Sequence, residues 1–270
     1  MAYDEFSTRM KMFEGRETGK FMPLLPIYIR LDGKGFSKFT KGMDRPYDTR
    51  MQSCMFKTTQ ALVKATGAKI GYTQSDEISL ILYSDSVDSQ VYFNGKKQKI
   101  VSVLASMATF HFNSFFNLIF KEDKWKDRMG LFDARAFTLP NKVEATNAVL
   151  WREQDATKNA IQMAASHYFS HKELHGKNGS EMQEMLWQEH GVNFNDYLAE
   201  FKRGIFVQRK AVEVPVQDLY VPDEIKARMQ KEGKESCTRH VYDMIGMPKF
   251  STVTNRTEVI FDGEDPVKAV

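Results

Sequence analysis

Two short segments place acidic side chains at the margin of apolar, β-prone runs. Asp32 and Gly33 end the first run, and Asp76 and Glu77 precede the second. A rigid strand holds a carboxylate in place, and a glycine in a turn lets the backbone approach a ligand closely. Two carboxylates within about 4–6 Å repel each other unless a cation lies between them. The two segments therefore indicate a Mg²⁺ site that faces a nucleoside triphosphate.

Strand pairing is the step that would bring Asp32 and Asp76 together, because they lie far apart in the sequence. In two-metal nucleotidyl transfer, ions roughly 3.5–4 Å apart activate the attacking oxygen and stabilise the leaving one. The carbonyl of Gly33 is a further hard oxygen ligand. Alternation along a strand directs Glu77 away from Asp76, so Glu77 would contact a ligand from the other side or lie outside the metal ligands. We therefore expect Asp32, Gly33 and Asp76 to bind two Mg²⁺ ions.

The same residues also fit an ordinary structural role. Asp-Gly is a common tight-turn dipeptide, and the Ser-Asp-Glu sequence at 75–77 suits a solvated turn or a helix cap. The two motifs together favour a site more than either does alone. Basic residues near them in the sequence could neutralise phosphates, although surface positions account for most of these cations. They are Arg30, Lys34, Lys38, Arg45, Arg50, Lys96, Lys97 and Lys99.

Composition sets the limits for any function. The chain has 270 residues, 42% of them hydrophobic, which is enough for a packed core. Its net charge of only +3 means that contact with a nucleic acid would depend on local patches. Cys54 and Cys237 lack metal-ligand spacing, which argues against a structural zinc site or a disulfide framework and favours a reducing, cytoplasmic location. Acidic residues at the N-terminus and the lack of any run near ~18 apolar residues argue against a signal peptide and a membrane span.

The positions of apolar residues predict which elements carry the acidic motifs. Strands are expected at 27–31, 68–72, 78–83 and 132–139, after a helical N-terminal segment that extends to residue 20. Helices at 48–65 and 100–120 separate them. This order predicts an α+β fold with a ferredoxin-like βαββαβ antiparallel sheet that carries helices on one face.

The remainder of the chain is predicted to be more helical. Helices are expected at 141–171, 180–190 and 194–201, followed by a strand at 204–208, and the tail after Pro215 shows no sustained periodicity. We therefore expect three regions. They are a catalytic core with an N-terminal helix at 1–140, a helical region for RNA binding or oligomerisation packed on it at 141–215, and a loosely packed C-terminal extension at 216–270.

The order of several motifs resembles the tRNA-His guanylyltransferase family and its Thg1-like relatives. The matching segments are 30–39, 45–50 and 71–77, with further matches at 132–135, 151–155 and 202–204. Each piece is weak by itself, but their combined order is specific and covers about residues 30 to 210. The resemblance implies a palm-like catalytic domain, similar to that of nucleic-acid polymerases.

The resemblance also implies an unusual direction of synthesis. A 5′-monophosphorylated RNA is first activated with ATP or GTP, and the 3′-hydroxyl of an incoming nucleotide then attacks the activated 5′ phosphate. The implied partners are tRNA, either tRNA-His or a 5′-truncated tRNA, and nucleoside triphosphates. The family further suggests a homotetramer.

The resemblance implies roles for individual residues, which are carried over from the family by matching positions in the motifs. Asp32, Gly33 and Asp76 look like the metal ligands, and Glu77 looks like a further acidic catalytic residue. The nucleotide-binding elements would be Asp32, Gly33, Lys34, Gly35, Phe36, Ser37, Ser75 and Asp76. Residues that resemble the family's triphosphate-binding or 5′-end-binding groups are Arg30, Arg45, Asp48, Lys96 and Lys99.

One departure from the family pattern concerns the choice of RNA. Enzymes that act strictly on tRNA-His carry a His-Ile-Asn-Asn motif after the Trp-Arg segment, whereas this chain has Thr157, Lys158, Asn159 and Ala160 there. Asn159 is the one retained residue, and Lys158 can contact phosphate without reading sequence. The segment resembles the Thg1-like branch, which repairs 5′-truncated tRNAs by template pairing.

Other interpretations remain open. Paired carboxylates and triphosphate binding also suit a nucleotide cyclase or a conventional polymerase. A protein that keeps the palm fold but has lost catalytic activity could also bind RNA. His167, His171 and His175 are spaced four residues apart, as metal ligands on one helix face would be, but nearby glycines favour exposed or RNA-adjacent histidines. The phenylalanines of 110–120 are expected in the core or in a subunit interface.

Overall fold

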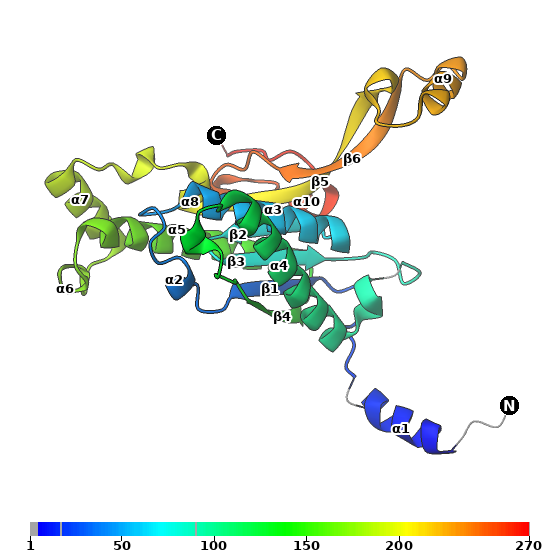
Figure 1. Cartoon of the computed structure of the whole chain (residues 1–270), viewed down its shortest axis with the longest axis horizontal. Helices are drawn as coiled ribbons and strands as arrows, with labels where there is room; N and C mark the ends of the chain where they lie inside the picture. Colours follow the sequence, from blue (N-terminus) through cyan, green and yellow to red (C-terminus); the bar gives the residue numbers. More distant parts are fainter. Residues whose placement is uncertain (1–4, 17, 90, 270) are drawn as a thin grey trace.

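The computed structural model describes residues 5–16, 18–89 and 91–269. The strands are β1 (Ile27–Gly33), β2 (Ile70–Gln74), β3 (Glu77–Leu82), β4 (Phe132–Thr138), β5 (Ile205–Pro215) and β6 (Ser236–Met244). They form one antiparallel sheet in the order β4-β1-β3-β2-β5-β6 (Figure 1). The first four strands along the chain confirm the predicted antiparallel palm-like sheet.

Ten α-helices lie within the described residues. They are α1 (Glu5–Arg16), α2 (Phe36–Phe39), α3 (Thr49–Thr66), α4 (Lys97–Ile119), α5 (Lys142–Tyr168), α6 (His171–Leu174), α7 (Gly179–His190), α8 (Ala199–Arg203), α9 (Asp223–Lys231) and α10 (Arg256–Asp262). Local sequence sets several ends. The Asp48 side chain accepts from the backbone N–H of Arg50 to cap α3, and Gly67 ends that helix with a φ of 65°.

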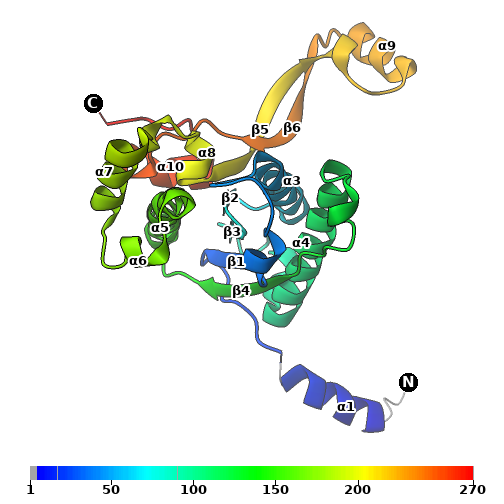
Figure 2. The same ribbon diagram turned by 60° about the vertical axis from the view of Figure 1, so that its left-hand side comes forward.

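One face of the sheet packs against α3 and α4. Alternate residues of β1, namely Ile27, Ile29 and Leu31, lie in a core with Leu62 of α3 and Phe112 of α4. All five side chains are buried because the apolar stripe of each helix meets the apolar side of the strand. Figure 2 shows the two helices on the same side of the sheet. This arrangement is the helix layer that the sequence predicts.

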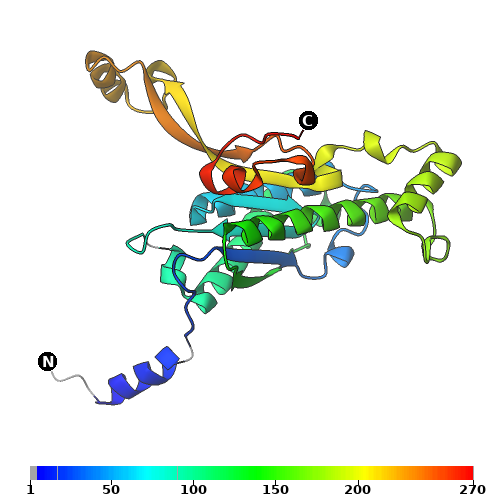
Figure 3. The ribbon, with the colours of Figure 1, turned by 180° about the vertical axis from the view of Figure 1, so that it is seen from behind.

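The opposite face of the sheet is also covered by helices. Tyr28 of β1 and Ile81 of β3 lie in a second core with Val149 of α5 and Ile260 of α10. The prediction of helices on one face therefore describes the part up to residue 140, and the later segments add a second layer. Figure 3 shows α5 crossing the sheet on this side. The proposed division of the chain at residues 140 and 215 stays a prediction.

The segment after Pro215 is not the loosely packed extension that the sequence suggests. β6 pairs with β5 along its whole length, and this hairpin extends beyond the body with α9 at its tip (Figures 1 and 3). α10 returns to the core, where the buried Gln208 side chain donates a hydrogen bond of 2.6 Å to the Val259 carbonyl. Residues far past Pro215 thus complete the second face of the sheet.

The helical region past β4 differs from the expectation in one detail. α5 ends at Tyr168, and His171 begins the separate helix α6, so the spaced histidines do not share one helix. No group of three His, Cys, Asp or Glu side chains that could hold a metal occurs in the described part of the chain. Within the same residues, no helix has the length and apolar character needed to span a membrane.

Candidate functional site

The end of β1 and the turn between β2 and β3 meet at one end of the sheet. Asp32 lies opposite Glu77 in the register of β1 and β3, and Ser75 and Asp76 form the turn that precedes β3. The Gly33 N–H donates a 3.1 Å hydrogen bond to the Asp76 carbonyl, which ties the two segments together. Strand pairing thus brings the two acidic motifs to the same place, although they are distant in the sequence.

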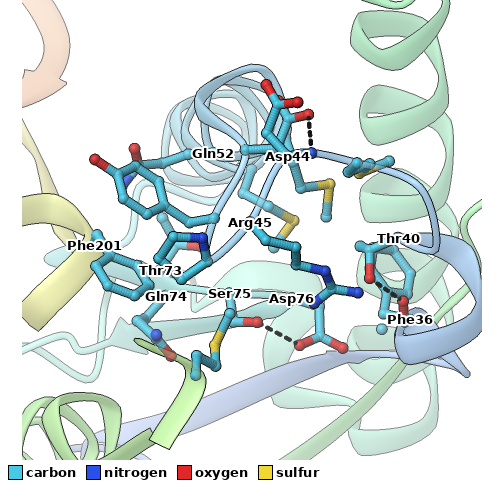
Figure 4. Close-up of a pocket in the computed structure, with 18 of the residues that line it drawn as sticks. Phe36, Thr40, Asp44, Arg45, Gln52, Thr73, Gln74, Ser75, Asp76 and Phe201 are labelled. Atoms are coloured by element: carbon cyan, nitrogen blue, oxygen red, sulfur yellow. Dashed lines mark hydrogen bonds between the residues drawn. The ribbon is translucent and has the colours of Figure 1, made fainter. Parts of the chain in front are cut away.

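The turn itself has a demanding backbone. Ser75 has a positive φ of 54°, and its hydroxyl donates a 3.1 Å hydrogen bond to Oδ1 of Asp76 (Figure 4). A non-glycine residue in this conformation is uncommon and is a frequent feature of functional turns. The hydroxyl therefore fixes the orientation of the Asp76 carboxylate.

A cavity of about 530 Å³ opens beside this turn on the α3 side of the sheet. Six residues of the expected nucleotide-binding elements line it, together with Arg45 and Asp48; the six are Gly33, Gly35, Phe36, Ser37, Ser75 and Asp76. Figure 4 shows the Arg45 side chain extending toward Asp76, with Phe201 on the opposite wall. The cavity combines apolar walls with a few polar groups, as small-molecule sites usually do.

Burial makes Asp76 an unusual carboxyl group. Desolvation raises its pKa above the ordinary value, and the nearby negative charge of Asp32 raises it further, against the opposing hydrogen bond from Ser75. A half-buried carboxylate beside a second one is costly unless a cation compensates for both. The pair is therefore suited to a bound cation.

Glu77 has a different environment from the two aspartates. Arg152 of α5 donates two hydrogen bonds to it, of 2.6 and 2.7 Å, and Arg30 lies 3.3 Å away. Burial raises the pKa of Glu77, while the charges of the two arginines lower it. Arg152 also bonds Asp155 at 3.1 Å, so the acidic turn is connected to α5 through a network of charged groups.

Asp48 is occupied by contacts within its own loop. Its carboxylate accepts hydrogen bonds from the backbone N–H groups of Asp44 and Arg50 and from the Arg50 guanidinium. Burial alone would raise its pKa, but these bonds outweigh burial and hold the pKa below the usual range. Asp48 therefore stabilises the loop that carries Arg45 along the cavity.

Not all of the expected site residues gather at the cavity. The backbone of Lys96 forms an isolated antiparallel β-bridge with Lys20, near the beginning of β1 and thus at the other end of the sheet. The amine of Lys99 lies over the Phe93 ring in the same region. The length of β1 separates that end from the acidic turn by about 20 Å. Asn159 is exposed on α5, one turn before Met163, which lines the cavity. Lys34 is exposed beside the site, where its N–H bonds the Leu131 carbonyl.

Sequence reasoning missed most of the residues that close the far side of the cavity. These are Met51, Gln52 and Met55 of α3, Met163 of α5, and Glu200 and Phe201 of α8. No local pattern marks them, because they come from three helices that meet only in the folded chain. The stacking of Tyr47 on Phe201, with ring centroids 4.3 Å apart, is an example of such a distant contact.

Comparison with known proteins agrees with this geometry. The family model described as "Thg1: tRNAHis guanylyltransferase" matches residues 7–140. An uncharacterized protein, R259, of Acanthamoeba polyphaga mimivirus is 30% identical over 225 residues, which cover 76% of this chain and 77% of the viral protein. The tRNA(His) guanylyltransferase of Saccharomyces cerevisiae is 27% identical over 231 residues, covering 80% of this chain and 95% of the yeast protein.

Solved structures show the same relationship. A bacterial tRNA(His) guanylyltransferase (Thg1)-like protein in complex with ATP superimposes with a TM-score of 0.77 at 32% identity, over 96% of this chain and 98% of the bacterial one. The Saccharomyces cerevisiae enzyme superimposes with a TM-score of 0.65 at 25% identity, over 73% of this chain and 91% of the yeast chain.

The similarity to guanylyltransferases, over a sheet and helices that superimpose on theirs, places this protein among the nucleotidyltransferases. More narrowly, the chain belongs to the tRNA(His) guanylyltransferase (Thg1) family.

Proposed function

We propose that this protein adds nucleotides to the 5′ end of tRNA in the 3′-to-5′ direction, through a 5′-nucleotidylated intermediate. The main support is the placement of Asp32 and Asp76 at one end of the sheet, where Asp76 also lines the cavity. Similar bacterial proteins have been solved with ATP and with GTP, which supports either nucleotide as a substrate here.

The cavity would hold the activating nucleotide by its base and its phosphates. Phe36, Met55 and Phe201 supply apolar surface for a base, and Arg45 supplies a positive charge for a phosphate. The Gly33 to Gly35 backbone bends closely past the cavity, because Gly35 has a φ of 68°. These features favour a bound nucleotide whose phosphates lie toward Ser75 and Asp76.

Mg²⁺ fits the oxygen atoms available at the turn. Asp32, the Gly33 carbonyl and Asp76 are hard donors, and the raised pKa of Asp76 indicates a carboxylate whose charge lacks compensation. The chain's own donors are fewer than Mg²⁺ requires, so phosphate oxygens of the nucleotide would complete the set. When bound, Mg²⁺ would neutralise the triphosphate and lower the pKa of an attacking hydroxyl group.

Two transfers would then follow at the same residues. In the first, a 5′-phosphate oxygen of the RNA attacks the α-phosphorus of ATP or GTP, and pyrophosphate leaves. In the second, the 3′-hydroxyl of the incoming nucleotide attacks the activated 5′ phosphorus, and the nucleoside monophosphate leaves. Arg45 would offset phosphate charge, while Arg152 and Glu77 would hold the acidic turn in position.

We further propose templated repair of 5′-truncated tRNA as the main activity. Lys158 and Asn159 are both exposed on α5, where they can reach an RNA backbone. The segment lacks the histidine and the second asparagine that accompany strict tRNA-His recognition in the resembling family. Cations that contact phosphates position an RNA without reading its sequence.

The deciding experiment supplies 5′-monophosphorylated tRNA that lacks its first nucleotide, together with Mg²⁺, ATP and all four nucleoside triphosphates. Full-length tRNA-His is tested in parallel, and Asp32→Asn serves as the inactive control. Template-matched growth at the 5′ end supports repair, whereas a single G added only to tRNA-His contradicts it. Growth at the 3′ end, or a cyclised nucleotide, would contradict 5′ addition altogether.

A further inference from the structure

Several polar side chains that line the nucleotide cavity already make hydrogen bonds within the protein. The Thr40 hydroxyl donates a bond of 2.8 Å to the Phe36 carbonyl, and the Thr73 hydroxyl donates one of 2.8 Å to the Glu77 carbonyl. Both carboxylate oxygens of Asp48 accept bonds from its own loop. These groups hold the walls together and leave few polar groups free to recognise a base.

Gln52 lines the same cavity with an amide group that has no partner. The residue lies one turn into α3, where its backbone N–H bonds the Asp48 carbonyl at 3.1 Å, and it is half-buried. Neither the oxygen nor the nitrogen of its amide makes a hydrogen bond within the described part of the chain. An amide that is partly withdrawn from water and left unpaired is available to a ligand.

Gln52 lies at the end of the cavity that suits a base. Figure 4 shows Gln52 and Asp76 at opposite ends, with Ser75 beside Asp76. Gln74, the other glutamine of the lining, is next to Ser75 in the chain and belongs to the Asp76 end. A nucleotide whose phosphates lie toward Asp76 therefore has its base toward Gln52.

The apolar part of the lining is rich in methionine. Its methionines are Met43, Met51, Met55 and Met163. Thioether side chains are flexible and polarizable, so they pack against rings of different shapes. The walls therefore favour a flat base without selecting which one, and the choice depends on polar groups at the edge of the base.

A glutamine amide matches the edges of both purines. Adenine presents the donor N6–H beside the acceptor N1, whereas guanine presents the acceptor O6 beside the donor N1–H. The amide carries an acceptor and a donor side by side, and a half-turn about its last side-chain bond exchanges them. In one orientation it forms two hydrogen bonds with adenine, and in the other it forms two with guanine.

We propose that Gln52 reads the purine of the activating nucleotide and allows the site to use ATP and GTP alike. The inference rests on the proposed function, because it assumes that the cavity holds this nucleotide with its phosphates toward Asp76. Asp44 and Glu200 also line the cavity, but a carboxylate only accepts hydrogen bonds. It matches guanine, with its neighbouring donors N1–H and N2–H, better than adenine. The amide of Gln52 serves both purines.

The test measures nucleotide binding in the absence of RNA, so that no transfer to RNA occurs. ATP, GTP and purine riboside triphosphate, which has no group at C6, are titrated with Mg²⁺ into wild type and Gln52→Leu by calorimetry. Wild type is expected to bind ATP and GTP with similar affinity and the C6-unsubstituted analogue about tenfold more weakly. Gln52→Leu should bind all three alike, because leucine keeps the apolar contact and cannot distinguish the group at C6.

Gln52→Glu tests the direction of recognition. Its carboxylate offers two acceptors, so GTP should bind about tenfold or more tightly than ATP. The added charge weakens both nucleotides, and the ratio of their affinities is therefore the readout. Gln98→Glu introduces the same charge at an exposed position in the first turn of α4, at the other end of the sheet, and should leave the ratio unchanged.

Three results would overturn the inference. They are continued discrimination against the C6-unsubstituted analogue in Gln52→Leu, a wild-type ratio in Gln52→Glu, and a ratio that changes only in Asp44→Asn, which would assign the base to Asp44. If wild type binds none of the nucleotides, the proposed function fails as well. If binding follows the expected pattern but truncated tRNA gains no nucleotide, the proposed function fails while the role of Gln52 in base recognition stands.

Discussion

The Glu77 carboxylate and the Arg152 guanidinium form a two-point pair, with Nε 2.6 Å from one carboxylate oxygen and a terminal nitrogen 2.7 Å from the other. The pair joins β3 to α5, and only 14% and 12% of the two side chains is exposed. Because both oxygens of Glu77 accept bonds from arginine, we expect Glu77 to position the acidic turn and not to bind Mg²⁺.

Loss of Arg152 should be costly for stability. Arg152→Met leaves the Glu77 charge largely buried, with only the Arg30 contact at 3.3 Å, and we expect a loss of about 3 kcal/mol in the free energy of unfolding. The double variant Glu77→Gln with Arg152→Met should be more stable than Arg152→Met alone, since the charge of the more buried Glu77 is removed and the charges that lose a partner, Arg30 and Asp155, are more exposed to water. Urea denaturation of the two single variants and the double variant measures this coupling. Strictly additive losses would show that the pair contributes nothing beyond its parts.

Asp76 should matter for catalysis and not for folding. Asp76→Asn removes a carboxylate that burial already disfavours, so we expect metal-free stability to be unchanged or higher. Nucleotide addition should fall by roughly three orders of magnitude or more, because several kcal/mol of charge stabilisation are lost. Thermal unfolding with EDTA and with Mg²⁺ and ATP provides the check, since ligand stabilisation should disappear in the variant. A variant that stays active would remove Asp76 from the proposed metal site.

Gly204 should tolerate no side chain. Its φ of 78° and ψ of −174° are nearly restricted to glycine, and a Cβ would lie 2.6 Å from the Thr73 carbonyl. Gly191 also has a positive φ, of 65°, but a Cβ there would have no neighbour within 4 Å. We expect Gly191→Ala to cost about 1 kcal/mol and Gly204→Ala about 3 kcal/mol or more. Chemical denaturation of both variants measures the difference, and similar losses would contradict both the clash and the stricter backbone requirement at Gly204.

Glu153 should make stability depend on pH. The residue is 1% exposed, one carboxylate oxygen accepts a hydrogen bond from the Phe250 N–H, and the other has no partner. Burial raises its pKa above the ordinary 4.5. At pH values between 4.5, the pKa in the unfolded chain, and the raised pKa in the folded protein, the folded state binds more protons than the unfolded state. Glu153 therefore reduces the free energy of unfolding as the pH rises through that range.

The isosteric variant Glu153→Gln tests this expectation. It keeps an oxygen for the Phe250 N–H and cannot ionise, so its stability above that pH range should exceed that of wild type by about 1.4 kcal/mol for each unit of pKa difference. Denaturation midpoints measured from pH 4 to pH 8 give the two curves. Parallel curves for wild type and variant would show that Glu153 does not titrate in this range.

The palm-like core was predictable from local sequence. Alternating or continuous apolar residues mark β1 and β3, and Asp48 and Gly67 mark the two ends of α3. The C-terminal part was predicted wrongly for a physical reason. Both sides of β6 are largely exposed on the projecting arm, so its sequence carries no apolar alternation, and α10 has only seven residues, too few for a helical period to be recognised.

The sequence by itself determined which residues could do chemistry, because the types and order of Asp32, Gly33, Asp76 and Glu77 are local properties of two short segments. Only the tertiary structure decided what each of them faces. Antiparallel pairing sets Asp32 opposite Glu77, and the packing of α5 brings Arg152 to Glu77. Such contacts depend on strand register and helix packing between distant segments, which no local pattern encodes.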